Sequence, residues 1–146
     1  MSNYDSYSDT MDHIADVQKE IYDFVGDLRG RAAVHDQSKL FSPEKELFDE
    51  LTPLLKTLTY GPEEYTESLK RLKPALDHHY ANNSHHAEFH EKGIDGMNLL
   101  DLVEMWCDWK AAVKRTKDGD IKKSLEINRK RFKLGDQLYN ILSNSI

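Results

Sequence analysis

The stretch His35-Asp36-Gln37-Ser38-Lys39 places an imidazole directly before a carboxylate, and we take this pair as the centre of the fold. Adjacent His and Asp side chains offer one nitrogen and one oxygen to a single divalent metal ion. The other histidines are not scattered, because five of the seven lie in residues 78–90 and the last is His13. Seven histidines in three places suggest a metal site assembled from distant segments.

The length and composition predict a folded protein without disulfides. A chain of 146 residues is typical of one domain that buries its own core. The lone Cys107 cannot form an internal disulfide, which favours a reducing compartment. No secretory signal and no membrane-spanning run is present, so we expect a cytoplasmic protein that does not associate with membranes. Residues 1–9 are polar and are expected to be a flexible N-terminus before a single domain over residues 10–146.

The charge is acidic overall but unevenly distributed. A net charge of −6 argues against stable binding of nucleic acid through its phosphate backbone. Residues 110–133 nevertheless contain ten Lys or Arg and three Asp or Glu. Such a basic segment can face a phosphate group, although solvated helices with Lys-rich outer faces are the more common explanation.

The apolar periodicity predicts an all-α chain of about six to seven helices, because no stretch alternates with period two. The predicted helices cover residues 10–29, 31–40, 43–58, 62–82, 97–116, 120–134 and 136–142. Tyr60-Gly61-Pro62 is typical of a turn between two of them.

Several residues are expected to set the helix boundaries. Ser42-Pro43-Glu44 supplies the cap, the first-turn proline and the acid of a helix start. Asp120 is expected to cap the helix that Gly135 ends. Pro53 is expected to kink or divide its helix, and Pro74 to bend the next one.

The predicted helix over residues 97–116 carries three carboxylates, Asp101, Glu104 and Asp108, on one face. They can form a solvated surface or present one acid to a metal. Because acids on helices are usually exposed, periodicity alone favours the surface. Cys107 lies between two tryptophans and is expected to be part of the core rather than a nucleophile.

The histidine cluster can supply more than one metal ligand. On an unbroken helix one face would carry His79, Asn83, His86 and His90. Adjacent His78 and His79 would point about 100° apart, so one of the two is expected at a given metal. Asn82-Asn83-Ser84 instead favours a break in the helix, with His85-His86 in the following loop. The alternative is a polar helix end whose histidines face solvent.

A metal ion could be bound by a mixture of imidazole and carboxylate ligands. This requires the convergence of His13, His35, Asp36, histidines of residues 78–90 and Asp108. The lack of thiolate ligands disfavours a structural zinc site. The donors suit one or two divalent ions among Mn, Fe, Co, Ni, Zn and Mg. Such an ion can lower the pKa of bound water and polarise a phosphoryl oxygen. No Gly-rich phosphate loop, G-x-S-x-G or H-E-x-x-H motif offers a competing chemistry.

The order of these residues resembles the HD superfamily of metal-dependent phosphohydrolases. The matching positions are His13, His35-Asp36, His79, His85-His86 and Asp108. His35-Asp36-Gln37-Ser38-Lys39 is similar to the His-Asp-x-x-Lys form of the branch that hydrolyses cyclic dinucleotides, although the Gly-Tyr-Pro tripeptide of that branch is absent. A closer similarity is to small uncharacterised HD-like proteins of phages and bacteria, and it covers nearly the whole chain. The resemblance implies a compact HD-like helical bundle.

The resemblance also implies roles for individual residues. The implied metal ligands are His13, His35, Asp36, His79, His85, His86 and Asp108. The choice among His79, His85 and His86 stays open, as does the choice among Asp101, Glu104 and Asp108. The implied catalytic residues are Asp36, Lys39, Glu88 and Arg115. The implied substrate contacts are Lys39, Asn83, Lys110, Arg115, Asn128 and Arg131, of which the Arg side chains can grip two phosphate oxygens.

The function expected from these residues is hydrolysis of a nucleotide or related small phosphate ester through a metal hydroxide held by His and Asp. The partner is then a small phosphorylated molecule, and a homo-oligomer is left open. One alternative is an HD-type di-iron oxygenase, because the same ligands can hold two irons. The other is a catalytically silent nucleotide-binding protein, for example a phage anti-defence factor.

Overall fold

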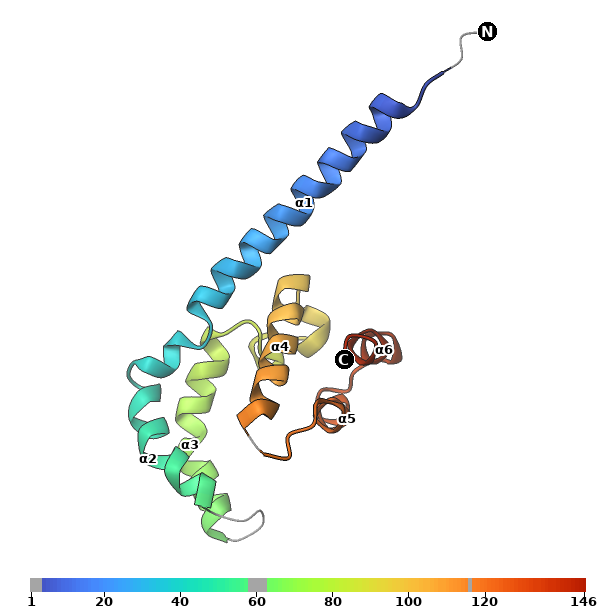
Figure 1. Cartoon of the computed structure of the whole chain (residues 1–146). Coiled ribbons are helices and arrows are strands. Elements are labelled where there is room, and N and C mark those ends of the chain that lie inside the picture. Colours follow the sequence, from blue (N-terminus) through green and yellow to red (C-terminus); the bar gives the residue numbers. More distant parts are fainter. Residues whose placement is uncertain (1–3, 58–62, 116) are drawn as a thin grey trace. The chain divides into compact units, whose positions relative to one another are not determined.

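The computed structural model describes residues 4–57, 63–115 and 117–146 of the chain. Within these residues it contains helices and no strand, which confirms the predicted all-α class (Figure 1). The α-helices are α1 (Tyr7–Val34), α2 (Glu44–Thr57), α3 (Glu63–Asn82), α4 (Leu99–Ala112), α5 (Ile121–Phe132) and α6 (Asp136–Ser143). Short 3₁₀ helices are η1 (Gln37–Leu40), η2 (Ala87–Phe89), η3 (Gly93–Gly96) and η4 (Val113–Arg115). The chain divides into two compact units, residues 1–34 and 35–146, and the single domain over residues 10–146 stays a prediction.

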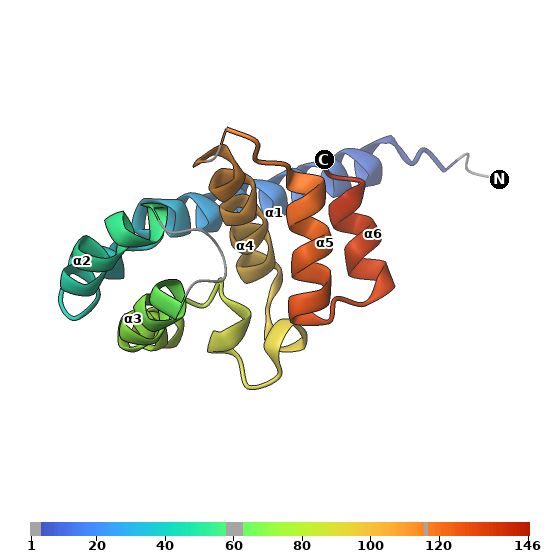
Figure 2. The ribbon, with the colours of Figure 1, turned by 90° about the horizontal axis from the view of Figure 1, so that it is seen from below.

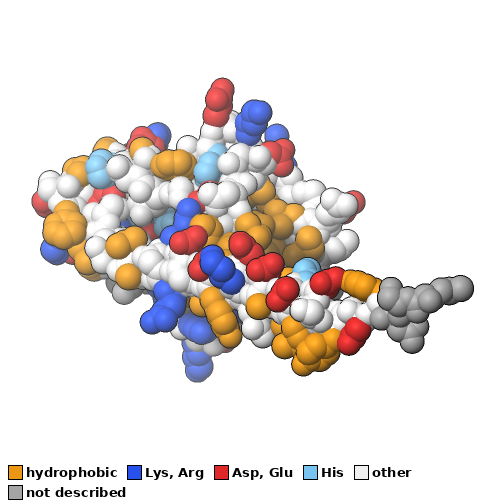
Figure 3. Space-filling model, turned by 90° about the horizontal axis from the view of Figure 1, so that it is seen from above, with side chains coloured by type: hydrophobic (Ala, Val, Ile, Leu, Met, Phe, Trp, Pro, Cys, Tyr) orange, Lys and Arg blue, Asp and Glu red, His pale blue; other side chains and the backbone are white. Residues whose placement is uncertain are grey.

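The first unit is built on α1, which is longer than the sequence predicts. It begins at Tyr7, where the Asp5 carboxylate accepts a hydrogen bond of 3.0 Å from the Tyr7 backbone N–H. It also continues through Gly26 and Gly30, although each interior glycine costs about 1 kcal/mol relative to alanine. None of its residues is buried. Near the start of the chain, apolar and acidic side chains lie together on the surface (Figure 3).

The second unit arranges its helices side by side in chain order. Helix α2 packs along α3, α4 lies next to α5, and α5 packs on α6 (Figure 2). The predicted helix over residues 31–40 is wrong as one element, because α1 takes its first residues and His35-Asp36 form a turn before η1. None of the described helices combines the length and the apolar character needed to cross a membrane.

The two prolines inside helices do not divide them. Helix α2 continues across Pro53, and α3 continues across Pro74. Pro53 and Asp49 are both exposed, so water can solvate the Asp49 carbonyl that loses its N–H donor. The predicted turn at Tyr60-Gly61-Pro62 lies outside the described residues.

The larger core of the second unit is formed by α4, α5 and α6. Its buried members are Met105, Trp106, Trp109, Leu125, Leu134 and Leu142. The Trp109 ring stacks on Phe132, with the ring centroids 5.9 Å apart and the planes 8° from parallel. Cys107 is exposed, so its predicted place in the core is wrong. Cys107 lies about 100° around the helix from Trp106, which turns it out of the core.

The residues at its ends define α5 and the start of α6. Asp120 caps α5 as predicted, and its carboxylate accepts from the backbone N–H groups of Lys122 and Lys123. Helix α5 ends before Gly135, because Lys133 adopts the left-handed conformation with φ 53°. Gly135 instead precedes α6 as its N-terminal flanking residue. The chain can therefore turn between α5 and α6 without a glycine at the turn itself.

A smaller core joins α2 to α3. Leu51 and Ala75 are completely buried and Leu72 is 5% exposed, with Leu47, Phe48 and Leu76 packed around them. Truncation of Leu51 to Ala should therefore leave a cavity and lower the free energy of unfolding by about 2–5 kcal/mol, measured by urea denaturation.

The matched control deletes the same atoms at Leu99, which is 61% exposed. Leu99→Ala should change the free energy of unfolding by no more than about 0.5 kcal/mol. Equal losses in the two variants would show that α2 and α3 are not held together by this core.

Candidate metal centre

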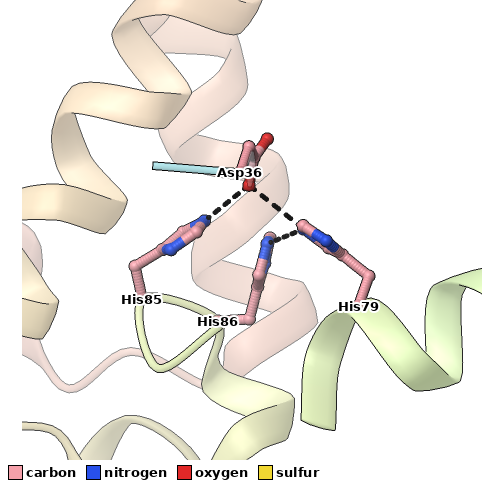
Figure 4. Close-up of side chains that lie close together, drawn as sticks. All are labelled: Asp36, His79, His85 and His86. Atoms are coloured by element: carbon pink, nitrogen blue, oxygen red, sulfur yellow. Dashed lines mark hydrogen bonds and ion pairs between the residues drawn. The ribbon is translucent and has the colours of Figure 1, made fainter. Parts of the chain in front are cut away.

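The centre of the site is the Asp36 carboxylate, which lies in the turn between α1 and η1. Asp36 has φ 57° and ψ 14°, a left-handed conformation that Asp adopts more readily than most residues. Its Oδ1 atom lies 3.2 Å from His79 Nε2 and 3.4 Å from His85 Nε2 (Figure 4). The backbone therefore adopts an uncommon conformation at the residue whose carboxylate meets two histidines.

The histidines come from the end of α3 and the turn after it. His79 lies in the last turn of α3, and the helix breaks at residue 82, so His85 and His86 lie beyond its end. His86 Nε2 lies 2.9 Å from His79 Nε2. Because the helix breaks, all three imidazoles face Asp36, which an unbroken helix could not achieve (Figure 4). His90 is turned away, and its Nε2–H donates a 2.8 Å hydrogen bond to the Ser84 carbonyl.

A second group of side chains adjoins the first. His35 Nε2 lies 3.7 Å from Asp36 Oδ2 and 3.8 Å from Asp108 Oδ1. Its Nδ1 lies 2.9 Å from Glu104 Oε1, and His85 Nδ1 lies 3.2 Å from the same oxygen. The two groups thus share Asp36, with one carboxylate oxygen facing each.

Neighbouring carboxylates determine which ring nitrogen of each histidine carries the proton and which has a lone pair for a metal. A carboxylate only accepts hydrogen bonds, so the Nδ1 atoms of His35 and His85 that face Glu104 carry the proton. His79 Nδ1 lies 2.9 Å from Glu44 Oε2 and is protonated for the same reason. The Nε2 lone pairs of all three histidines then point toward Asp36. This is the arrangement in which metal-binding histidines are commonly held.

The geometry around Asp36 fits a metal ion. Among the described residues, neither Asp36 Oδ1 nor His85 Nε2 makes a hydrogen bond, although both atoms are buried. A buried polar atom without a partner requires an explanation, and a cation between the two would satisfy both. With metal–ligand bonds of about 2.0–2.1 Å, tetrahedral ligands lie about 3.3–3.4 Å apart and neighbouring octahedral ligands about 3.0 Å apart. The observed separations of 2.9, 3.2 and 3.4 Å match these values.

Asp36 and His86 are in the protonation states that metal binding needs. Burial raises the pKa of Asp36, but contacts with His79, His85 and Lys39 outweigh it and hold the pKa well below its usual range. Burial, together with the charges of His85 and His79, lowers the pKa of His86 to about 3. At neutral pH the carboxylate is therefore charged and His86 is neutral, which is the form that binds a metal.

Glu44 anchors the histidines from the opposite side. Its carboxylate is completely buried, lies 2.7 Å from His78 Nδ1, and accepts a 3.1 Å hydrogen bond from Ser38 Oγ. Burial raises the pKa of Glu44, whereas hydrogen bonds from His78 and Ser38 and the charge of His79 lower it below its usual value. Both adjacent histidines thus contact Glu44 through Nδ1, and His79 is the one of the two that belongs to the donor group around Asp36.

Two predicted substrate-binding residues lie beside the site. Lys39 Nζ lies 2.6 Å from Asp36 Oδ2, and its side chain is 33% exposed. Asn83 donates through Nδ2 to Ser38 Oγ at 2.9 Å and to the His79 carbonyl at 2.8 Å. Lys39 therefore places a positive charge at the site, whereas Asn83 orients the residues that hold His79.

Four other predicted site residues contact side chains outside the donor groups described above. Glu88 and Arg131 form an ion pair of 2.7 Å with each other. The Nδ2 atom of Asn128 lies 3.4 Å from Ser124 Oγ. Lys110 lies over the Trp106 ring, 5.7 Å from its centroid. The roles assigned to these residues stay predictions.

The remaining predicted residues are exposed and belong to other parts of the chain. Arg115 ends the short helix η4. His13 lies on α1, in the first unit, and is absent from the donor groups formed by the described residues of the second unit. Its assignment as a metal ligand stays a prediction, as does the catalytic role of Arg115.

The carboxylates of α4 have three different surroundings. Asp101 is 2% exposed, accepts a 2.6 Å hydrogen bond from Ser84 Oγ, and forms a capping box with Asn98. Glu104 faces the Nδ1 atoms of two histidines, and Asp108 lies near the Nε2 atom of His35. The predicted solvated surface is wrong, because the turn after α3 covers this face of α4.

Sequence reasoning missed Glu44 and Ser38 as parts of the site. The sequence predicts Glu44 only as an acid in the first turn of a helix, where such residues are common. Burial distinguishes it from an ordinary first-turn acid, and burial depends on how α2 packs against α3. No local pattern in the sequence indicates this contact.

Together the fold and the site define an all-α protein with a cluster of histidines and carboxylates able to hold a metal ion. A model of a family of unknown function, DUF5662, matches residues 2–146. The chain therefore belongs to the DUF5662 family. No curated protein and no solved structure matches it significantly.

The Glu44 contact predicts an effect on metal affinity. Glu44→Gln keeps the size of the side chain but removes the charge that holds His79 Nδ1–H. We expect the dissociation constant for Zn²⁺ or Mn²⁺ to rise about 10–100-fold, measured by competition with a chromophoric chelator. Glu46→Gln makes the same change at an exposed position of α2 and should leave the affinity unchanged.

The pKa of His86 predicts a dependence of stability on pH. The unfolded chain protonates this residue below about pH 6.5, whereas the folded chain does so only near pH 3. The free energy of unfolding of chelator-treated protein should therefore fall as the pH drops below 6.5, with a slope of up to about 1.4 kcal/mol per pH unit from this one proton.

Urea titrations between about pH 7 and pH 5 test this dependence, because Asp36 and Glu44 contribute only at lower pH. His86→Asn should make the curve flatter over this range. His13→Asn removes an exposed histidine and should leave its slope as in the wild type. A slope that survives in His86→Asn would contradict the assignment.

Proposed function

We propose that the protein is a metal-dependent phosphohydrolase of the HD type, acting on a nucleotide or a related small phosphate ester in the cytoplasm. The observation that carries the proposal is the convergence of the His79 and His85 Nε2 lone pairs on Asp36 Oδ1. The lack of sulfur donors and the mixture of imidazole and carboxylate fit Mn²⁺, Fe²⁺, Co²⁺, Ni²⁺ or Zn²⁺. The resemblance to HD phosphohydrolases agrees with a His-Asp pair in a turn that faces His79 from the end of a following helix and His85 from the turn after it.

The proposed chemistry divides the work between the ion and the chain. A divalent ion bound by Asp36, His79, His85 and His86 would lower the pKa of a bound water and polarise a phosphoryl oxygen. Glu44 and Glu104 keep the histidine Nε2 atoms directed at that position. Lys39 supplies a positive charge beside it, where a phosphate group would accumulate negative charge.

The contact between Lys39 and Asp36 favours a site that holds a single ion. His35, Asp36 and Asp108 could hold another ion next to the first. However, Lys39 Nζ lies 2.6 Å from Asp36 Oδ2, the oxygen that faces this second position. A second cation would have to displace the ammonium group, so we propose that occupancy of this position requires Lys39 to move.

Replacement of Asp36 by Asn tests the proposal. Asn keeps the size of the side chain and tolerates the left-handed backbone, so the turn should survive. We expect loss of bound metal by elemental analysis, with an affinity at least about 100-fold lower, and loss of phosphate release from a panel of nucleotides. Asp49→Asn, at an exposed position on α2, should retain both metal and activity.

Measurements on the Asp36→Asn variant and on the wild type together separate the alternatives. Full turnover by Asp36→Asn would overturn the phosphohydrolase proposal. Tight nucleotide binding with intact metal and no product would instead favour a catalytically silent binding protein. Because the two donor groups share Asp36, a di-iron oxygenase is the second candidate. About two irons per chain and oxygen uptake would favour it.

A further inference from the structure

A surface pocket of about 650 Å³ lies where the end of α3 meets η2. Its lining residues are Asp77, Tyr80, Ala81, Glu88 and Phe89. The first three share one face of α3, and the last two belong to η2, which lies beside α3 (Figure 2). The volume is within the range of about 300–1,000 Å³ that is typical of small-molecule sites. The pocket can therefore hold a ligand of the size of a nucleoside.

Arg131 of α5 contacts both walls of this pocket. Its Nη2 lies 2.7 Å from Glu88 Oε1, on the η2 side. Burial lowers the pKa of the Arg131 guanidinium, but contacts with Tyr80 and Glu88 outweigh burial and raise it. Arg131 thus holds Tyr80 of α3 and Glu88 of η2 in place, so the pocket is formed before a ligand enters it.

The lining combines aromatic rings with carboxylates. Tyr80 and Phe89 supply the rings, and Phe89 is 45% exposed. The bases of nucleotides stack on such rings. The carboxylates of Asp77 and Glu88 only accept hydrogen bonds, so they favour a ligand edge that carries N–H donors. A flat ring with an amino group satisfies both parts of the lining.

The charge of the pocket favours a neutral ring over an organic cation. Lys73 Nζ lies 2.6 Å from Asp77 Oδ2, and Arg131 pairs with Glu88. These two cations balance the two carboxylates, whereas an organic cation needs negative charge that is not already compensated. The carboxylates still have lone pairs for further N–H donors, because each carboxylate can accept about four hydrogen bonds.

The pocket adjoins the proposed metal position through His86. The ring centroids of Tyr80 and His86 lie 4.9 Å apart, and His86 is one of the four donors around Asp36. In a nucleotide a single sugar joins the base to the phosphate, so a base beside Tyr80 would leave its phosphate close to the metal. We propose that this pocket binds the base of the substrate and prefers bases with an exocyclic amino group. The inference rests on the proposed nucleotide substrate and names the bases that the site accepts.

Binding of nucleosides to the full chain tests the pocket apart from the metal, because a nucleoside has no phosphate. Cytidine carries an amino group where uridine carries a carbonyl oxygen, which a carboxylate repels. Cytidine should therefore bind at least about 10-fold more tightly than uridine, measured by isothermal titration calorimetry. Asp36→Asn, which should lose the metal, should keep this preference.

Two variants locate the binding site. Phe89→Ala removes one aromatic ring and should weaken cytidine binding at least about 10-fold. Ile127→Ala truncates an apolar side chain that is 65% exposed on α5 and should leave cytidine binding within about twofold of the wild type. Cytidine binding that survives in Phe89→Ala would overturn the proposal.

A further variant tests the source of the preference. Glu88→Gln can donate as well as accept, so the preference for cytidine over uridine should fall below about threefold. Glu91→Gln makes the same change at an exposed position beyond η2 and should leave the ratio unchanged. A purely structural effect of Glu88→Gln would weaken both nucleosides and keep their ratio, which would overturn the role of the carboxylate.

The outcomes separate this inference from the proposed hydrolysis. Equal binding of the two nucleosides, or binding of neither at millimolar concentration, would overturn the pocket even if metal and phosphate release are found. Choline binding that Phe89→Ala removes, without nucleoside binding, would overturn it in favour of an organic cation. A cytidine preference in a chain without phosphate release would support the pocket and overturn the hydrolase.

Discussion

The site depends on carboxylates that hold the far side of each histidine. Glu44 faces His79 Nδ1 and Glu104 faces His85 Nδ1, so that both Nε2 lone pairs are directed at Asp36. An imidazole without a partner at Nδ1 can rotate, and its Nε2 lone pair then has no fixed direction. A carboxylate that accepts a hydrogen bond from Nδ1–H fixes the ring, so the Nε2 lone pair points in one direction. The packing of α2, α3 and α4 positions these carboxylates, and in this sense the fold of the second unit serves the geometry at Asp36.

Much of the fold could be predicted from the sequence, because the apolar residues follow the helical period over long segments. The all-α class and the cap at Asp120 follow from such local patterns. The boundaries of α1 did not, since continuation through Gly26 and Gly30 depends on the balance of small propensities. Burial of Asp101 and exposure of Cys107 could not be predicted either, because they depend on which segment covers each face of α4.

For the site, the sequence indicates the residue types but not their roles. The grouping of the histidines in the sequence predicts that Asp36, His79 and His85 belong to one site. A metal ligand and a carboxylate that orients a histidine differ in their contacts. To tell them apart, one must know which ring nitrogen of each histidine faces which carboxylate oxygen. Glu44 and Glu104 are ordinary helix acids in sequence, and only tertiary contacts between elements distinguish them.

The buried position of Glu44 also limits how this protein can change over time. Its carboxylate has no access to solvent and is held by His78, His79 and Ser38. A lineage that replaced His79 would leave a buried charge with one partner fewer, which is costly for folding whether or not the chemistry is still needed. Selection for foldability alone would then preserve His79. Loss of His79 is therefore expected to be tolerated only together with a change at Glu44, so the two positions should change as a pair.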